Sequence, residues 1–401
     1  MIKIYSIVTL IPFFLGYIQL SAQTWDSKAS LPNNIGKHHP VTFGIDGFGY
    51  SVTGTSASSQ TSKDFFKYDP VNDSWSKLTD FPGAARSFAI GQAYNGKAYM
   101  GFGYQFNFLN DLWEFDPINS SWTQLSSCPC EGRRHPAFIV TEGRIFVGLG
   151  DGNSGNLKDW WSYEIDTDTW TQENDIPGPV RHHPFMFAAG DHIYAGMGHG
   201  GNNIYSDWYE FDIDTDTWTE LNNFPGEARV AGTQFALGGY GYVLSGDGDN
   251  HNFMNEGEFW EYDPFNDDWE QLPSHPGISR WAPGSFTLDN TVYFLGGENR
   301  SSGAIKGDMW SYQLGPIASL KNTQAEEKKA FFYPNPTNGQ LNLNTSIAPR
   351  SIQFFNLSGE MIEEITSFNK LKINLNNLSK GIYWIKASSE NEMFIEKLVV
   401  N

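Results

Sequence analysis

Six basic residues recur at equivalent positions along the chain, each thirteen residues before an aromatic residue in a short apolar run that ends on glycine. They are Lys37, Arg86, Arg133, Arg181, Arg229 and Arg280. Guanidinium groups form paired hydrogen bonds with carboxylates. A ring of such bases would therefore suit an anionic or polar ligand, such as an acidic glycan or a carboxylate-bearing peptide. The alternative, which we favour for most of the set, is that each base pairs with a nearby acid or backbone carbonyl and locks neighbouring repeats together.

Further polar residues are expected near these bases. The segments that follow the glycine-ended runs supply Asp151, His199, Asp247 and Glu298, and His183 stands at the start of another apolar run. We predict that these five residues, with the five arginines, form one ligand-binding mouth. Acid/base catalysis would need an arginine and a carboxylate to meet there, for example Arg181 or Arg229 with Asp151, Asp247 or Glu298. Many folds satisfy that description, so we assign no catalytic residue.

A repeat of about fifty residues must position these groups. Its clearest copy runs from Asp207 to Pro225, and five further copies match it in register. The first residue of the pattern corresponds to Asp64, Asp111, Asp159, Glu258 and Asp308. Each copy holds four short apolar runs, here called a to d, separated by turn-forming residues. Six such copies predict an all-β protein with a six-bladed β-propeller, in which run a lines the central channel.

The sixth copy lacks the tryptophan that should follow Tyr312 in its fourth run. The missing piece matches Trp25 to Pro32, near the other end of the chain. We therefore predict that residues 23–32 supply the outer strand of the last blade. Closure in this way removes an exposed sheet edge.

The repeats resemble the kelch family. The resemblance rests on the glycine-ended second run, the tyrosine and tryptophan separated by six residues, and the base that opens run a, as in Arg280 to Gly297. It covers residues 23–315, although only Gly296 and Gly297 keep the family's glycine doublet. The chain is also similar in blade count to N-acetylneuraminate epimerase, and galactose oxidase has kelch-like blades. These likenesses imply an alternative function as a carbohydrate-active enzyme of the sialic-acid epimerase (mutarotase) or galactose-oxidase-like type.

Metal and disulfide chemistry are less well supported. Five of the nine histidines lie at the starts of run a: His38, His39, His135, His182 and His183. Blades 1 and 4 lie on opposite sides of a propeller, so a shared metal site would have to span the channel, and we predict no metal and no cofactor. The acids between runs c and d are expected to form solvated turns rather than a calcium site. Cys128 and Cys130 are either two thiols or a small Cys-x-Cys disulfide.

The two ends of the chain indicate export. Residues 1–22 have a lysine, an apolar core and a small-residue end, as a secretory signal peptide does. After a linker at 316–330, residues 331–401 are expected to form a small β-sandwich that resembles the type A sorting domain of the type IX secretion system (T9SS). The resemblance rests on a set of motif residues: Pro334, Asn335, Pro336, Gly339, Gly359, Gly381, Tyr383 and Lys397. It implies the secretion machinery and its sortase as partners, and a secreted or cell-surface location.

The net charge of −20 argues against nucleic acid and anionic membrane surfaces as partners. The sequence contains no apolar run after the signal segment that is long enough to span a membrane. We therefore expect an exported kelch propeller that is more a binding module than an enzyme, with a glycan or protein bound at the channel mouth.

Overall fold

The computed structural model describes residues 24–190, 192–314, 332–333, 337, 339–343, 351–356, 361–365, 372–375, 378–388 and 393–400. The expected signal peptide and linker lie outside these residues, as do Pro334, Asn335, Pro336 and Gly359 of the sorting motif. The chain forms two compact units, residues 1–317 and residues 318–401. Each unit is described by itself.

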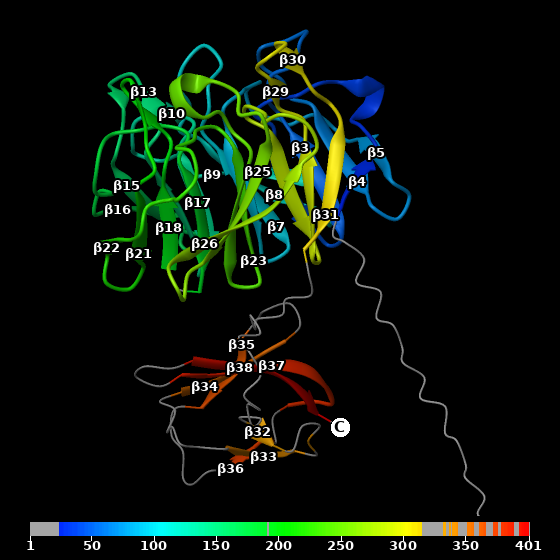
Figure 1. Ribbon diagram of the computed structural model, residues 1–401, viewed down its shortest axis with the longest axis vertical. Coiled ribbons are helices and arrows are strands. Elements are labelled where there is room, and N and C mark those ends of the chain that lie inside the picture. The colour runs from blue at the N-terminus through cyan, green and yellow to red at the C-terminus, as the bar shows by residue number, and fades with distance from the viewer. Residues whose placement is uncertain are drawn as a thin grey trace, which may run out of the picture. The chain divides into compact units, whose positions relative to one another are not determined.

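The first unit is the predicted six-bladed propeller (Figure 1). Each blade is a four-stranded antiparallel sheet. Blades 1 to 3 are β2 (Val41–Ile45), β3 (Phe48–Val52), β4 (Phe65–Asp69), β5 (Ser74–Lys77); β6 (Ile90–Tyr94), β7 (Lys97–Gly101), β8 (Leu112–Asp116), β9 (Ser121–Leu125); β11 (Ala137–Thr141), β12 (Arg144–Gly148), β15 (Trp160–Glu164), β16 (Thr169–Glu173). Blades 4 to 6 are β17 (Phe185–Ala189), β18 (His192–Gly196), β21 (Trp208–Asp212), β22 (Thr217–Glu220); β23 (Thr233–Leu237), β24 (Tyr240–Leu244), β25 (Gly257–Asp263), β26 (Asp268–His275); β27 (Gly284–Leu288), β28 (Thr291–Leu295), β31 (Met309–Gln313), β1 (Trp25–Lys28).

The innermost strands of the blades form a closed circle. Each of β2, β6, β11, β17, β23 and β27 contacts the innermost strand of both neighbouring blades. The buried cores lie between blades: Phe187, Tyr194 and Trp208 of blade 4 pack with Tyr262 and Trp269 of blade 5. The middle strands are therefore apolar on both faces, because each sheet is covered on both sides by its neighbours.

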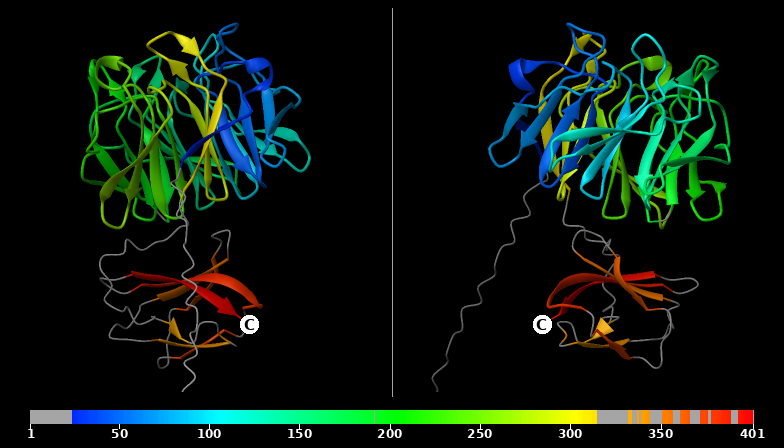
Figure 2. Two further views of the ribbon diagram at one scale, coloured as in Figure 1. Left: turned by 45° about the vertical axis from the view of Figure 1, so that its right-hand side comes forward. Right: turned by 180° about the vertical axis from the view of Figure 1, so that it is seen from behind.

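The N-terminal strand β1 is the outermost strand of the sixth sheet. It pairs antiparallel with β31, with Trp25 opposite Tyr312 and Lys28 opposite Met309. The Trp25 indole packs against Phe259 and Phe294, and its Nε1 donates a 2.9 Å hydrogen bond to the carbonyl of Pro273. The ring of blades is thus held by strand pairing between residues from the two ends of the propeller segment (Figure 2).

The glycine after each second strand has a left-handed backbone, with φ of 92° at Gly103 and 106° at Gly246. A Cβ atom on Gly246 would lie 2.8 Å from the carbonyl oxygen of Val230. Glycine is required here because the connection between the second and third strands crosses close to the backbone of the segment that enters the first strand.

Short elements extend these connections beyond the blades at one end of the propeller, where Figure 1 labels β10, β13, β29 and β30. They are β10 (Arg133–Arg134), β13 (Asp151–Gly152), β14 (Gly155–Asn156), β19 (His199–Gly200), β20 (Asn203–Ile204), β29 (Glu298–Asn299), β30 (Ala304–Ile305) and the 3-10 turn η2 (Asp249–His251). A second 3-10 turn, η1 (Pro32–Asn34), follows β1.

The second unit contains two small sheets, as the sequence predicts for this segment. One sheet has the order β32 (Phe332–Tyr333), β33 (Gln340–Leu343), β36 (Lys372–Asn374); the other has the order β35 (Met361–Ile365), β34 (Ser351–Phe355), β37 (Gly381–Ser388), β38 (Met393–Val400). Leu341 and Ile373 of the first sheet share a buried core with Phe354 and Leu398 of the second.

Four described motif residues have identifiable places in this unit. Gly339 has φ 102°, Gly381 begins β37, and the hydroxyl of the buried Tyr383 donates a 2.8 Å hydrogen bond to the carbonyl of Ser379. Lys397 lies in β38 opposite Trp384. Within the described part of the chain, no helix has the length and apolar character needed to cross a membrane.

Candidate functional site

The six recurrent bases are buried, and each forms an ion pair with an acid at the start of the third strand of its own blade, which is the residue just before the strand in five blades and the second strand residue in blade 5. The six pairs are Lys37–Asp64, Arg86–Asp111, Arg133–Asp159, Arg181–Asp207, Arg229–Glu258 and Arg280–Asp308. These charges hold the entry to the first strand of a blade against the start of the third. The arrangement corresponds to the structural alternative stated above for these bases.

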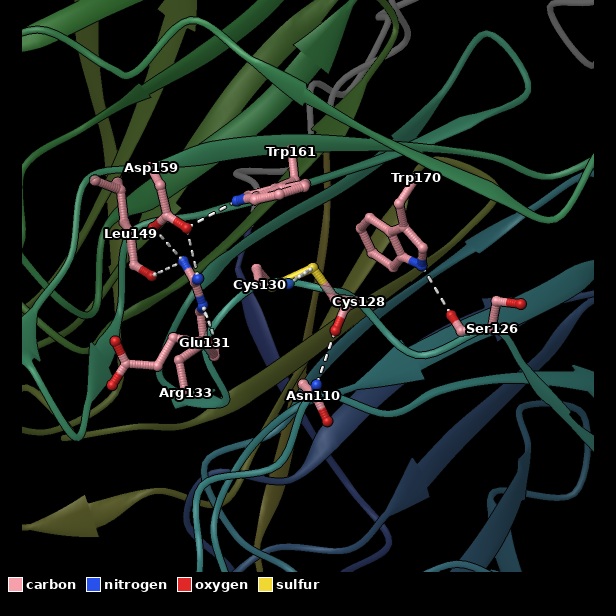
Figure 3. Close-up of a disulfide and its surroundings, with 10 residues drawn as sticks. All are labelled: Asn110, Ser126, Cys128, Cys130, Glu131, Arg133, Leu149, Asp159, Trp161 and Trp170. Atoms are coloured by element: carbon pink, nitrogen blue, oxygen red, sulfur yellow. Dashed lines mark hydrogen bonds and ion pairs between the residues drawn. A yellow bond between two sulfur atoms is a disulfide. The ribbon is translucent and has the colours of Figure 1, made fainter.

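The pair in blade 3 shows the shared geometry (Figure 3). Both terminal nitrogens of Arg133 donate to Asp159, at 2.7 and 2.8 Å, and one of them also donates to the carbonyl of Leu149 at 3.0 Å. The indole of Trp161 donates a further 2.8 Å bond to the same carboxylate. Burial disfavours the ionised form of Asp159, but these bonds and the charge of Arg133 outweigh burial and lower the pKa of the carboxyl.

Blade 5 departs from this pattern. A longer glutamate, Glu258, replaces the aspartate, and only the Nη2 atom of Arg229 donates to it. The Nη1 atom is buried and has no hydrogen-bond partner. Burial therefore lowers the pKa of Arg229, although Glu258 partly opposes the shift.

A second layer of residues lies outside the ion pairs, at the end of the propeller that carries the short strands. In every blade the residue after the recurrent base pairs through its backbone with a residue of the segment that follows the second strand. These pairs are His38 with Thr55, Ser87 with Tyr104, Arg134 with Asp151, His182 with His199, Val230 with Asp247, and Trp281 with Glu298. We call these twelve residues the mouth. It brings together four of the predicted site residues, Asp151, His199, Asp247 and Glu298.

Trp281 is the large aromatic side chain of the mouth. It is partly exposed, its ring lies 5.0 Å from that of His38, and the guanidinium of Arg300 lies 5.0 Å from its centre. Arg300 also contacts the buried Asp247, with 3.3 Å between Nε and Oδ2. An indole face flanked by an arginine and a carboxylate can stack on a flat or ring-shaped ligand and hydrogen-bond its polar groups.

Asp247 is the mouth acid whose pKa departs most from its ordinary value. Its side chain is fully buried, and neither carboxylate oxygen has a hydrogen-bond partner. Burial raises its pKa to about 7, with the charge of Glu298 adding to the shift and that of Arg300 opposing it. A carboxyl group with this pKa can accept or donate a proton near neutral pH.

Opposite charges also meet in blade 3, where Arg134 donates to Asp151 at 2.8 Å. Beside this pair, Nδ1 of His182 lies 2.9 Å from Oδ1 of Asn156, and the His182 ring packs edge-on against His199. The mouth thus carries both signs of charge rather than a ring of bare cations.

The channel narrows directly below the mouth. In each blade the narrow point is the second residue after the recurrent base, one position beyond the mouth residue of that segment. These six residues, which we call the neck, are His39, Phe88, His135, His183, Ala231 and Ala282. All have left-handed backbones, with φ between 50° and 63°. Backbone hydrogen bonds join neighbouring neck residues around the ring, for example from His183 N to His135 O at 3.1 Å and from His39 N to Ala282 O at 2.8 Å. The neck forms one wall of a cavity of ≈ 130 Å³ that continues along the innermost strands.

The sequence argument against a shared histidine cluster depended on blades 1 and 4 being far apart. At the neck the channel is narrow, and Nε2 of His39 lies 3.0 Å from Nε2 of His183. The rings of His135 and His183 stack with centroids 3.5 Å apart. Burial lowers the pKa of all three imidazoles well below the usual value, and the neighbouring histidines add to this effect.

Two further regions are structural. Cys128 and Cys130 form a disulfide in the loop that leads into blade 3, and the carbonyl of Cys128 accepts a hydrogen bond from Asn110 (Figure 3). The acids between the third and fourth strands hydrogen-bond to nearby backbone: Asp212 accepts from the amides of Asp214 and Thr215, and Asp168 accepts from that of Ser126. Asp212 thus forms a turn between its own strands, as the sequence predicts, whereas Asp168 links blade 3 to the backbone of blade 2.

The sequence did not single out Arg300, which contacts the mouth residues Trp281 and Asp247. Arg300 belongs to the irregular loop between β29 and β30, which has no counterpart of fixed length in the other blades, so repeat alignment cannot place it. The base–acid pairing could have been found, because the two columns recur together in all six copies.

Comparisons with known proteins agree with this architecture. A model of the Attractin/LZTR1 β-propeller matches residues 49–310, and a model of a secretion system C-terminal sorting domain matches residues 331–401. No curated protein sequence matches the chain significantly. Among solved structures, that of YjhT is similar, with a TM-score of 0.59 and 16% identity over 70% of this chain and 95% of that chain. This likeness concerns the fold.

The kelch-type blades, the matched family model and the matched C-terminal module lead to one assignment. The chain belongs to the Attractin/LZTR1 β-propeller family and carries a C-terminal sorting domain that implies secretion to the cell surface or beyond.

Proposed function

We propose that this exported propeller is a binding module that holds a glycan at the mouth. The observation that carries the proposal is the partly exposed Trp281 ring, with Arg300 over its face and Asp247 beside it. A sugar ring packs well on an indole, while its hydroxyls need both donors and acceptors, which Arg300 and Glu298 supply.

The recurrent arginines have a different part in this proposal. Arg86, Arg133, Arg181, Arg229 and Arg280 are engaged in buried ion pairs, so they shape the mouth rather than contact the ligand. Ligand contacts are assigned instead to Arg134, His182, His199, Trp281, Glu298 and Arg300. An acidic sugar would meet Arg134 or Arg300, although each must share its charge with a neighbouring aspartate.

Export belongs to the same proposal. The sorting domain supports passage through the type IX secretion system, with the secretion machinery and its sortase as partners. We propose that residues 1–22 are the signal peptide that first delivers the chain to the periplasm. A binding module on the outside of the cell would then meet glycans of the surroundings.

The test is a glycan array probed with the purified full chain. The proposal predicts discrete glycan ligands, and their signals should disappear for Trp281→Ala but persist for Phe265→Ala. Phe265 is a suitable control because it is an exposed aromatic residue in the turn between β25 and β26, outside the mouth. An array without ligands, or ligands that bind both variants equally, would contradict the proposal.

A second candidate function is supported by Asp247 alone. A carboxyl group with a pKa of about 7 and two oxygens without hydrogen-bond partners is suited to acid/base catalysis on a sugar. Arg181 and Arg229, the arginines first considered for such chemistry, are paired with Asp207 and Glu258, so Arg300 would be the partner. Mutarotation of sialic acid, followed by NMR, would favour this function if the wild-type chain accelerates it and Asp247→Asn does not.

A further inference from the structure

Three histidines from three different blades converge at the neck. His39 enters from blade 1, His135 from blade 3 and His183 from blade 4, each at the residue that precedes a proline at the start of the innermost strand. One ring nitrogen from each residue lies within 4.8 Å of those of the other two. A repeat architecture does not require this, because the equivalent positions in the other blades hold Phe88, Ala231 and Ala282.

Three of the six ring nitrogens of this cluster have no hydrogen-bond partner in the protein. Both ring nitrogens of His135 are buried without a hydrogen-bond partner, and so is Nδ1 of His183. A neutral imidazole carries one N–H donor and one lone pair, and leaving these groups unpaired in the interior costs about 1–3 kcal/mol for each. Unpaired nitrogens that converge on one point therefore indicate a missing ligand.

His39 is already oriented for such a ligand. Its Nδ1 lies 2.7 Å from Nδ1 of His38, which directs Nε2 toward His183. A hydrogen bond to the second ring nitrogen is the usual way in which proteins fix the tautomer and direction of a metal-binding histidine. His38 is itself held by ring contacts with Trp281.

We propose that His39, His135 and His183 bind one zinc ion at the neck of the propeller. Three imidazole ligands without a carboxylate suit Zn²⁺ and related transition metals rather than Mg²⁺ or Ca²⁺. Tetrahedral coordination with Zn–N bonds of about 2.0–2.1 Å places ligand atoms roughly 3.3 Å apart. The 3.0 Å separation of the two Nε2 atoms fits this spacing, and the His135 ring must turn and approach by at most about 1.5 Å.

The surroundings allow a cation here. Arg134 is the nearest fixed positive charge, and Asp151 forms an ion pair with it. The fourth coordination position would face the cavity below the neck, which can hold water. The zinc site adjoins the mouth, because the ring of Trp281 packs edge-on against that of His39 with centroids 4.5 Å apart. None of the three proposed zinc ligands is among the proposed glycan contacts.

The test is Zn²⁺ binding by the metal-stripped full chain, measured by competition with a chromogenic chelator. The proposal predicts one tightly bound Zn²⁺ per chain. His135→Ala and His39→Ala should each weaken binding by more than about 100-fold, since each removes a direct ligand. The alanine variants are compatible with the fold, because Ala231 and Ala282 already occupy equivalent positions with the same backbone conformation.

Two matched histidine variants serve as controls. His192→Ala alters a half-buried histidine on β18, and His199→Ala alters the mouth; neither should change the affinity. Absence of bound Zn²⁺, or binding that depends on His199 but not on His135 and His39, would overturn the proposal. If a neck variant fails to fold, the visible absorption of the Co²⁺-loaded wild-type chain decides: a tetrahedral nitrogen-rich spectrum supports the site, and an octahedral oxygen-type spectrum refutes it.

Discussion

At the scale of single residues, the molecule uses its charges in two ways. The recurrent bases are inside and paired, whereas Arg134, Arg300 and two of the mouth acids, Asp151 and Glu298, are partly exposed. The distinction has energetic consequences. Removal of one partner from a buried ion pair leaves an uncompensated charge and costs about 3–5 kcal/mol, while exposed pairs contribute about 0–1 kcal/mol.

Asp159→Asn should therefore lower the free energy of unfolding of the propeller by about 3 kcal/mol, because Arg133 remains buried without its counter-charge. Asp80→Asn, which breaks the exposed Lys77–Asp80 pair, is the control and should cost less than about 1 kcal/mol. Urea denaturation of both variants measures the difference. Equal costs would show that the buried pairs do not stabilise the blades.

A buried histidine makes the propeller sensitive to acid. Burial and the charge of Arg280 lower the pKa of His275 to about 3, and the ring hydrogen-bonds to Ser245. The folded pKa lies below the unfolded value of about 6.5, so His275 contributes stability above that pH and loses it as the pH falls toward 3. The loss should reach about 2 kcal/mol near pH 5.

His275→Gln should reduce the difference in unfolding free energy between about pH 7.5 and about pH 5 by that amount, since glutamine does not titrate. Denaturation curves at the two pH values, for the variant and the wild type, provide the measurement. An unchanged pH dependence would mean that His275 does not remain neutral in the folded protein.

At the scale of elements, β1 is the strand that closes the ring of blades, because it pairs with β31 of the sixth blade. Trp25→Ala should destabilise the propeller by about 2–4 kcal/mol, because it removes a large indole packed against Phe259, Phe294 and Tyr312. Asp26→Ala, in the same strand but exposed, should have little effect. Thermal unfolding and limited proteolysis of the β31 edge would detect the change, and a Trp25→Ala variant as stable as Asp26→Ala would show that β1 is not needed for closure.

The elements were the most predictable part of the protein. Turn residues and alternating apolar runs recur in every copy, so local patterns and the repeat agree on where strands begin. The sixth copy lacks a tryptophan that the segment from Trp25 to Pro32 supplies. This match predicted that the N-terminal segment completes the sixth blade and closes the ring.

The site was less predictable than the fold. The columns of bases and acids were both visible, but their pairing depends on how the first and third strands of a blade meet. The convergence of His39 with His183 depends on the width of the channel, which periodicity does not give. Arg300 lies in an irregular loop, where no repeat fixes its position.

At the scale of the whole molecule, the two units have different roles. The propeller holds the candidate binding surface, and the second unit is a sorting domain. Deletion of residues 331–401 should leave the propeller in the periplasm, because the signal for outer-membrane passage is removed. Cell fractionation with surface proteolysis measures this, and a point variant in the propeller such as Phe265→Ala controls for general loss of expression. Surface display of the truncated chain would contradict the sorting role.

The central claim is that ligands bind at the mouth through Trp281. It is tested most directly by calorimetric titration of the strongest array glycan into the wild-type chain and the Trp281→Ala variant, with Phe265→Ala alongside. The account predicts that Trp281→Ala weakens binding at least tenfold, about 1.4 kcal/mol, while Phe265→Ala binds as the wild type does. Equal affinity of the wild type and Trp281→Ala would contradict it.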